Sequence, residues 1–74
     1  GVDVYVERHL DDKKLLLTRI PINIDYETYD RMSFEERAAT LEPLVRVLRS
    51  AYRKSDEPIV HIEVSINEMY WTDE

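Results

Sequence analysis

The sequence contains no cysteine, and its single glycine is Gly1. The lack of cysteine excludes disulfide bridges, thiolate zinc sites and cysteine nucleophiles. A glycine-rich phosphate-binding loop is excluded as well, because no glycine lies inside the chain. The sequence also has no run of about 18 apolar residues, and it opens without the basic and apolar blocks of a signal peptide. We therefore expect a cytoplasmic protein that neither crosses nor binds a membrane.

Basic residues are scarce relative to acidic ones: 10 Lys and Arg stand against 16 Asp and Glu, which gives a net charge of -6. This balance disfavours nucleic acid as a partner, because affinity for a phosphate backbone comes from Lys and Arg. The serines have no recognisable base near them in the sequence, so we predict no enzyme activity and no cofactor. The 74 residues form one domain (residues 1–74) whose core is near the lower limit for independent stability, which favours a partner.

One stretch of the chain has the 4-3-4-3-4 spacing of an apolar helix face, formed by Phe34, Ala38, Leu41, Val45, Leu48 and Tyr52. Ser33 and Glu36 have the spacing of a capping box, which predicts the start of this helix. Pro43 removes one backbone hydrogen bond, so the helix is predicted to be kinked but continuous. It is predicted to end near Ser55, because Pro58 and the residues just before it cannot continue a helix.

Apolar and polar residues alternate over residues 2–10, 15–24 and 59–67, which is the period of a strand with one buried face. A short loop joins the first two strands in a hairpin that pairs Val4 with Ile20. These elements predict a two-layer α+β fold of order β-β-α-β, with a mostly antiparallel three-stranded sheet and the helix on one face. Strand order 2-1-3 makes every pairing antiparallel and is preferred over 1-2-3. The last strand is predicted to bury Val60, Ile62, Val64 and Ile66.

Two segments allow more than one structure. Residues 25–32 can form a single helical turn capped by Asp25. Residues 68–74 either extend the last strand or form an acidic aromatic tail. Within them, Tyr70 and Trp71 either cover the open end of the core or project as an anchor for a partner.

A sheet covered by one helix leaves its other face open, and Tyr5, Leu15 and Leu17 are predicted to lie together there. Scattered exposed apolar residues are normal on proteins. Open sheet edges and the small core favour instead an interface with a second copy or another protein. We predict partner contacts on this face and at the tryptophan, with an acidic segment as the electrostatic element: Tyr5, Leu15, Leu17, Arg19, Trp71, Asp25, Glu27 and Asp30.

Arg46, Arg49 and Arg53 form a basic row on the outer face of the predicted helix. A solvated helix surface explains this row, since Glu42 precedes Arg46 by four residues in the favourable order for an ion pair. The alternative is a phosphate-binding patch. The sequence thus predicts a small acidic protein-binding or inhibitory module that occludes a partner's surface and forms a homodimer. The alternative class is a dimeric nucleic-acid-binding regulator.

The two histidines are the one constellation with potential chemistry. Under strand order 2-1-3, Glu7, His9, His61 and Glu63 gather on the open sheet face, and such groups can bind zinc. No short ligand motif accompanies them in the sequence. We therefore predict ordinary surface histidines and no metal site.

Overall fold

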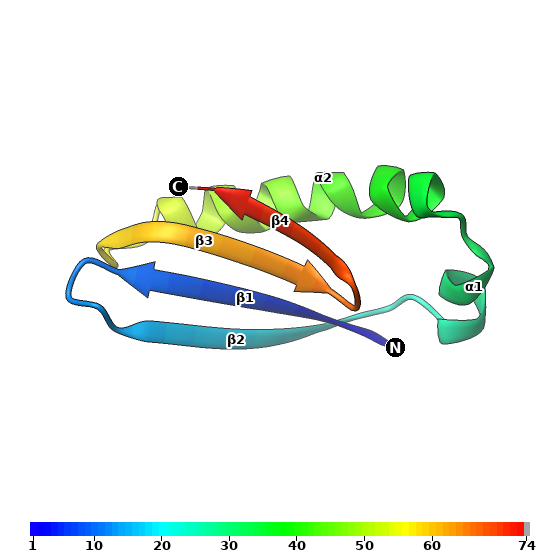
Figure 1. Cartoon of the computed structure of the whole chain (residues 1–74), viewed down its shortest axis with the longest axis horizontal. Helices are drawn as coiled ribbons and strands as arrows, with labels where there is room; N and C mark the ends of the chain where they lie inside the picture. The colour runs from blue at the N-terminus through cyan, green and yellow to red at the C-terminus, as the bar shows by residue number, and fades with distance from the viewer. Residues whose placement is uncertain (74) are drawn as a thin grey trace.

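A computed structural model describes residues 1–73 of the chain and places them in two layers. A four-stranded antiparallel sheet forms one layer, and the long helix α2 runs along one face of it, with the short helix α1 at one end (Figure 1). The elements, in chain order, are β1 (Val2–Leu10), β2 (Leu15–Ile22), α1 (Tyr26–Arg31), α2 (Phe34–Arg53), β3 (Ile59–Ile66) and β4 (Met69–Asp73). The α+β class and the helix-on-sheet arrangement predicted from the sequence are confirmed.

The strands lie in the order β2-β1-β3-β4, and all neighbouring strands are antiparallel. The predicted order 2-1-3 is therefore confirmed, as is the hairpin register that pairs Val4 with Ile20. The predicted number of three strands is wrong, because residues 69–73 turn back and pair with β3. Asn67 makes this turn possible with a φ of 53°, a left-handed conformation that asparagine tolerates better than most residues. Glu74, part of the predicted tail, lies outside the described residues.

Both helices begin at the predicted caps. The carboxylate of Asp25 accepts a hydrogen bond from the Thr28 backbone N–H at the start of α1. At the start of α2, the Ser33 hydroxyl accepts from the Glu36 N–H while the Glu36 carboxylate accepts from the Ser33 N–H. The helix then continues through Pro43, as predicted. No helix within residues 1–73 is long and apolar enough to cross a membrane.

The core lies between the sheet and the two helices. Alternating residues of β1 and β3 pack against Tyr29 of α1 and the buried face of α2, and the fully buried side chains are Val2, Val4, Val6, Tyr29, Leu41, Val45, Ile62, Val64 and Ile66. Two predicted core positions are wrong. Phe34 is 67% exposed, and the aromatic side chain buried at this end is Tyr29 instead. Val60 is 52% exposed, because a register shift between β1 and β3 pairs Leu10 with Ile59 and leaves Val60 as an extra residue.

Arg8 is a charged residue on the helix-facing side of β1, and sequence reasoning missed it. Its Nη1 donates to Glu57 Oε1 at 2.8 Å, and its Nη2 donates to Thr18 Oγ1 at 2.7 Å. The guanidinium carbon also lies 4.6 Å from the centre of the Tyr52 ring. The Arg8 side chain, only 11% exposed, thus ties β1 to β2, to α2 and to the segment before β3.

Candidate functional site

The sheet face turned away from α2, here called the outer face, collects most of the residues predicted to contact a partner. Cross-strand register places its side chains in rows, one of which contains Arg19, Tyr5, Ser65 and Tyr70. The next row contains Leu17, Glu7, Glu63 and Thr72, and the row beyond it contains Leu15, His9 and His61. The structure therefore brings together the predicted residues Tyr5, Leu15, Leu17 and Arg19.

The apolar side chains of the outer face are well exposed. Leu15 is 54% exposed, Leu17 63%, Tyr5 38% and Tyr70 65%. Tyr70 was not among the residues predicted for this face, because residues 68–74 were expected to extend the last strand or to form a tail, and not to turn back as a fourth strand. Alternation along β4 is the signal that finds it, since Tyr70 and Trp71 must point to opposite faces of a strand.

Trp71 lies on the other side of the sheet, apart from the residues with which it was grouped. It is partly buried and packs against the core, so it does not share a surface with Tyr5 and Leu17. With Phe34 at the start of α2, it lines a shallow cleft of about 330 Å³, whose full lining is Phe34, Ala38, Glu68, Met69, Tyr70 and Trp71. We call this the α2–β4 cleft. Sequence reasoning did not place Phe34 on a surface, because its spacing with the helix stripe assigned it to the core.

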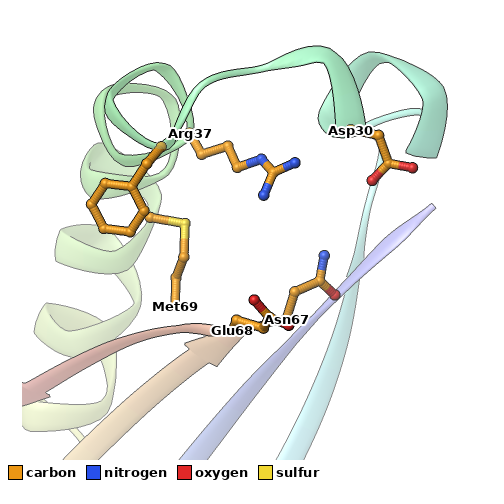
Figure 2. Close-up of a pocket in the computed structure, with 6 residues that line it drawn as sticks. Asp30, Arg37, Asn67, Glu68 and Met69 are labelled. Carbon is orange, nitrogen blue, oxygen red and sulfur yellow. The ribbon is translucent and has the colours of Figure 1, made fainter.

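A second hollow of about 510 Å³ adjoins this cleft between α1, the start of α2 and the β3–β4 turn. Figure 2 shows Arg37 extending into it from α2, with Asp30 on one side and Asn67 and Glu68 across from it. Arg37 is held by Tyr29: its guanidinium carbon lies 4.4 Å from the ring centre, and its Nε donates to the Tyr29 carbonyl at 3.0 Å. The predicted acidic residue Asp30 thus lines a hollow beside the α2–β4 cleft.

The other acidic residues at this end of the molecule stabilise the starts of the two helices. Asp25 caps α1, and Glu27 lies 3.9 Å from Arg31 one turn later, with both side chains more than 80% exposed. Hydrogen bonds from the Ser33 backbone and side chain lower the pKa of Glu36 below its usual 4.5. These carboxylates also stabilise the positive ends of the helix dipoles, so capping and dipole compensation account for much of the acidic segment.

The basic row of α2 makes intramolecular contacts. Arg46 Nη2 lies 3.2 Å from Glu42 Oε1, the ion pair predicted for a solvated helix face. Arg49 Nη1 donates to the Thr72 carbonyl at 3.2 Å, and Arg53 Nη1 donates to the Ile59 carbonyl at 2.9 Å. The latter two arginines therefore hold α2 against backbone groups of β4 and β3. These contacts explain the row without a phosphate ligand, and the nucleic-acid regulator stays a hypothesis.

The two histidines meet on the outer face, as strand order 2-1-3 requires. His9 and His61 are direct cross-strand neighbours, with ring centres 5.1 Å apart and ring planes at 65°. Glu7 Oε2 lies 3.5 Å from His9 Nε2. In the part of the chain that the structure describes, no group of three or more His, Cys, Asp or Glu side chains is arranged to hold a metal ion.

The chain matches no protein-family model, and comparison with curated proteins and with solved structures finds no match either.

Proposed function

We propose that this chain is a small protein-binding module that acts by covering surfaces and that pairs with a second copy of itself through the outer face. The observation that supports this proposal is the exposure of Tyr5, Leu15, Leu17 and Tyr70 on one face of the sheet. Helix α2 covers the opposite face of the sheet, so it cannot cover the outer face as well. A second layer over the outer face would remove these side chains from water. Each Å² of apolar surface buried in this way contributes about 25 cal/mol of favourable free energy.

The size of the outer face suits a dimer. Four strands spaced about 4.8 Å apart, with a rise of about 3.3 Å per residue, span roughly 500 Å² in flat projection. Side chains standing on the sheet raise the accessible area toward the roughly 800 Å² per partner of a standard interface.

Pairing through the outer face leaves the α2–β4 cleft free for a different protein. The cleft offers exposed Phe34 beside partly buried Trp71, and Asp30 and Glu68 lie at the hollow next to it. A partner of complementary chemistry presents a large apolar side chain flanked by basic residues. Binding there covers the partner's basic surface, which is inhibition by occlusion rather than by chemistry.

The self-association is tested by light scattering on a size-exclusion column over about a hundredfold range of concentration. The chain mass of 8.9 kDa should double at the higher concentrations. Leu17→Lys on the outer face should restore the single-chain mass. Val47→Lys is the matched control, because Val47 is 65% exposed, close to the 63% of Leu17, but lies on α2. A single-chain mass for the unmodified protein throughout would refute the proposal.

Partner binding has its own readout, because Trp71 is the only tryptophan in the chain. A protein that enters the α2–β4 cleft should change the emission of Trp71, and Phe34→Asp should abolish both the change and the binding. Leu17→Lys should leave both intact. A partner whose binding is lost with Leu17→Lys and kept with Phe34→Asp would show that the outer face, and not the cleft, is the partner site.

A further inference from the structure

The histidine pair on the outer face has the spacing of two ligands that share one metal ion. His9 on β1 and His61 on β3 are direct cross-strand neighbours, and their ring centres are 5.1 Å apart. A nitrogen-to-zinc bond of 2.0–2.1 Å places the metal about 3.2 Å from each ring centre, so two imidazoles at a tetrahedral angle have centres about 5.2 Å apart. The separation of the rings thus matches that of two ligands of one ion. The rings meet edge to face, so rotation about the side-chain torsions brings a nitrogen of each ring onto the ion.

The surroundings of this pair add a second observation that points to a cation. One row along the sheet, Glu7 and Glu63 are direct cross-strand neighbours. Like charges in this position destabilise a sheet pair. The other members of that row are Leu17 and Thr72, and the histidine row continues to Leu15, so in the described sheet neither row contains a Lys or Arg. A bound cation would neutralise the repulsion between the two carboxylates.

Glu7 is placed to orient the ring of His9. Its Oε2 lies 3.5 Å from His9 Nε2, the position of a carboxylate that orients a metal-ligating histidine through the other ring nitrogen. In that arrangement His9 would bind the metal through Nδ1. No third side chain joins the set among the described residues, which contain no group of three or more potential ligands. Water completes the coordination of such a two-histidine chelate.

We propose that His9 and His61 form a binding site for a divalent transition-metal ion, with Glu7 as a positioning residue. Imidazole ligands suit copper, nickel and zinc, and the general order of affinity for such sites places Cu²⁺ above Ni²⁺ and Zn²⁺. Both ligands belong to one chain, but they lie on the outer face that the proposed dimer would cover, so the metal is titrated at concentrations where the chain has its single-chain mass. The site takes one ion per chain, and Mg²⁺ or Ca²⁺, which prefer oxygen ligands, do not compete for it.

The test is calorimetric titration of the metal-stripped chain, residues 1–74, with Cu²⁺, Ni²⁺, Zn²⁺ and Mg²⁺. The expected result is one ion per chain, tightest for Cu²⁺, with no binding of Mg²⁺. His9→Asn and His61→Asn should each weaken Cu²⁺ binding by at least tenfold, and Glu7→Gln should weaken it by about tenfold. The control is Glu42→Gln, which removes an exposed carboxylate on α2 and should leave the affinity unchanged.

Folding of each variant is checked by thermal unfolding without metal, and the same melts with Cu²⁺ give a second readout. Cu²⁺ should raise the melting temperature of the unmodified chain and of Glu42→Gln but not of the histidine variants, because only a ligand bound to the folded state stabilises it. Affinity that survives loss of either histidine would overturn the proposal. A stoichiometry of one ion per two chains would also overturn it, since the metal would then be shared between copies.

Discussion

The contact between Arg8 and Glu57 should contribute measurably to stability, although both residues are charged. The perturbation is a double-mutant cycle with Arg8→Met, which keeps the apolar stem of the side chain, and Glu57→Gln, which keeps its shape. Arg8 also contacts Thr18 and Tyr52. Both the Arg8→Met single mutant and the double mutant lose these contacts, so their contribution cancels. The interaction energy from the cycle therefore reports the Arg8–Glu57 pair alone.

The magnitude follows from burial. The Arg8 side chain is 11% exposed and the Glu57 side chain 32%, with 2.8 Å between Nη1 and Oε1. Hydrogen bonds to charged groups contribute about 1.5–3 kcal/mol when water is excluded, and partial exposure of Glu57 favours the lower end of that range. Arg46 and Glu42 provide a matched control in the same chain, because their side chains are 69% and 57% exposed. Exposed pairs of this kind contribute about 0.3–0.5 kcal/mol.

The assay is urea-induced unfolding of the four proteins of each cycle, followed by circular dichroism. Protein concentration must be the same throughout, because the proposed self-association would change the apparent stability. The expected interaction energy is about 1.5 kcal/mol for Arg8–Glu57 and at most about 0.5 kcal/mol for the control pair. An Arg8–Glu57 value no larger than that of the control would refute the conclusion that Arg8 ties the sheet to the segment before β3.

Three further perturbations have expected outcomes. Hydrogen bonds from Ser33 lower the pKa of Glu36 below 4.5, so this carboxylate's stabilising contribution is present above pH 4.5 and is lost as the pH falls through the lowered pKa. Ser33→Ala keeps the hydrogen bond from the Ser33 backbone N–H, the larger cause, so it should raise that pKa only part of the way toward 4.5 in an NMR titration. It should cost about 1 kcal/mol of unfolding free energy in urea, and an unchanged free energy would contradict the capping geometry. Lys13→Gly should raise the unfolding free energy by about 0.5 kcal/mol, because Lys13 has a φ of 71°, and a loss of stability would show that this conformation is not strained. Pro43→Ala should raise the melting temperature through the restored helix hydrogen bond, and a lower value would mean that the helix depends on the proline.

Local patterns predicted the elements whose stability is local. Alternation and a short loop were enough for the β1–β2 register, because a slip of one residue would have turned Val4 and Ile20 to opposite faces. The capping box located the start of α2, since both of its hydrogen bonds join residues three apart. Alternation along β1 also places Arg8 on the buried side. That position could have been read from the sequence, but its partner Glu57 could not, because the pair is formed by tertiary structure.

The remaining features depend on competition between distant segments. Phe34 has helical spacing with the core residues, but Tyr29 from α1 is the aromatic side chain buried at that end. Val60 continues the alternation of β3, yet the register shift next to His9 leaves it exposed. Strand β4 follows a turn in which Asn67 adopts a left-handed conformation, and the alternation of polar and apolar residues does not predict such a turn.

The candidate surfaces also combine features set by local patterns with features set by tertiary structure. Tyr5, Leu15, Leu17 and Arg19 could be placed on one face from the pattern of two adjacent strands. The addition of Tyr70, the separation of Trp71 and the spacing of the histidine rings all require the three-dimensional pairing of β3 with its neighbours.

The central claim is that the outer face is where two copies of this protein meet. The most direct measurement is an isotope-filtered NMR experiment on a mixture of labelled and unlabelled chains, which detects contacts between copies only. The proposed dimer predicts contacts between chains from the side chains of Tyr5, Leu17 and Tyr70. Contacts from Phe34 and Trp71 instead, or none at concentrations where the mass has doubled, would contradict the claim.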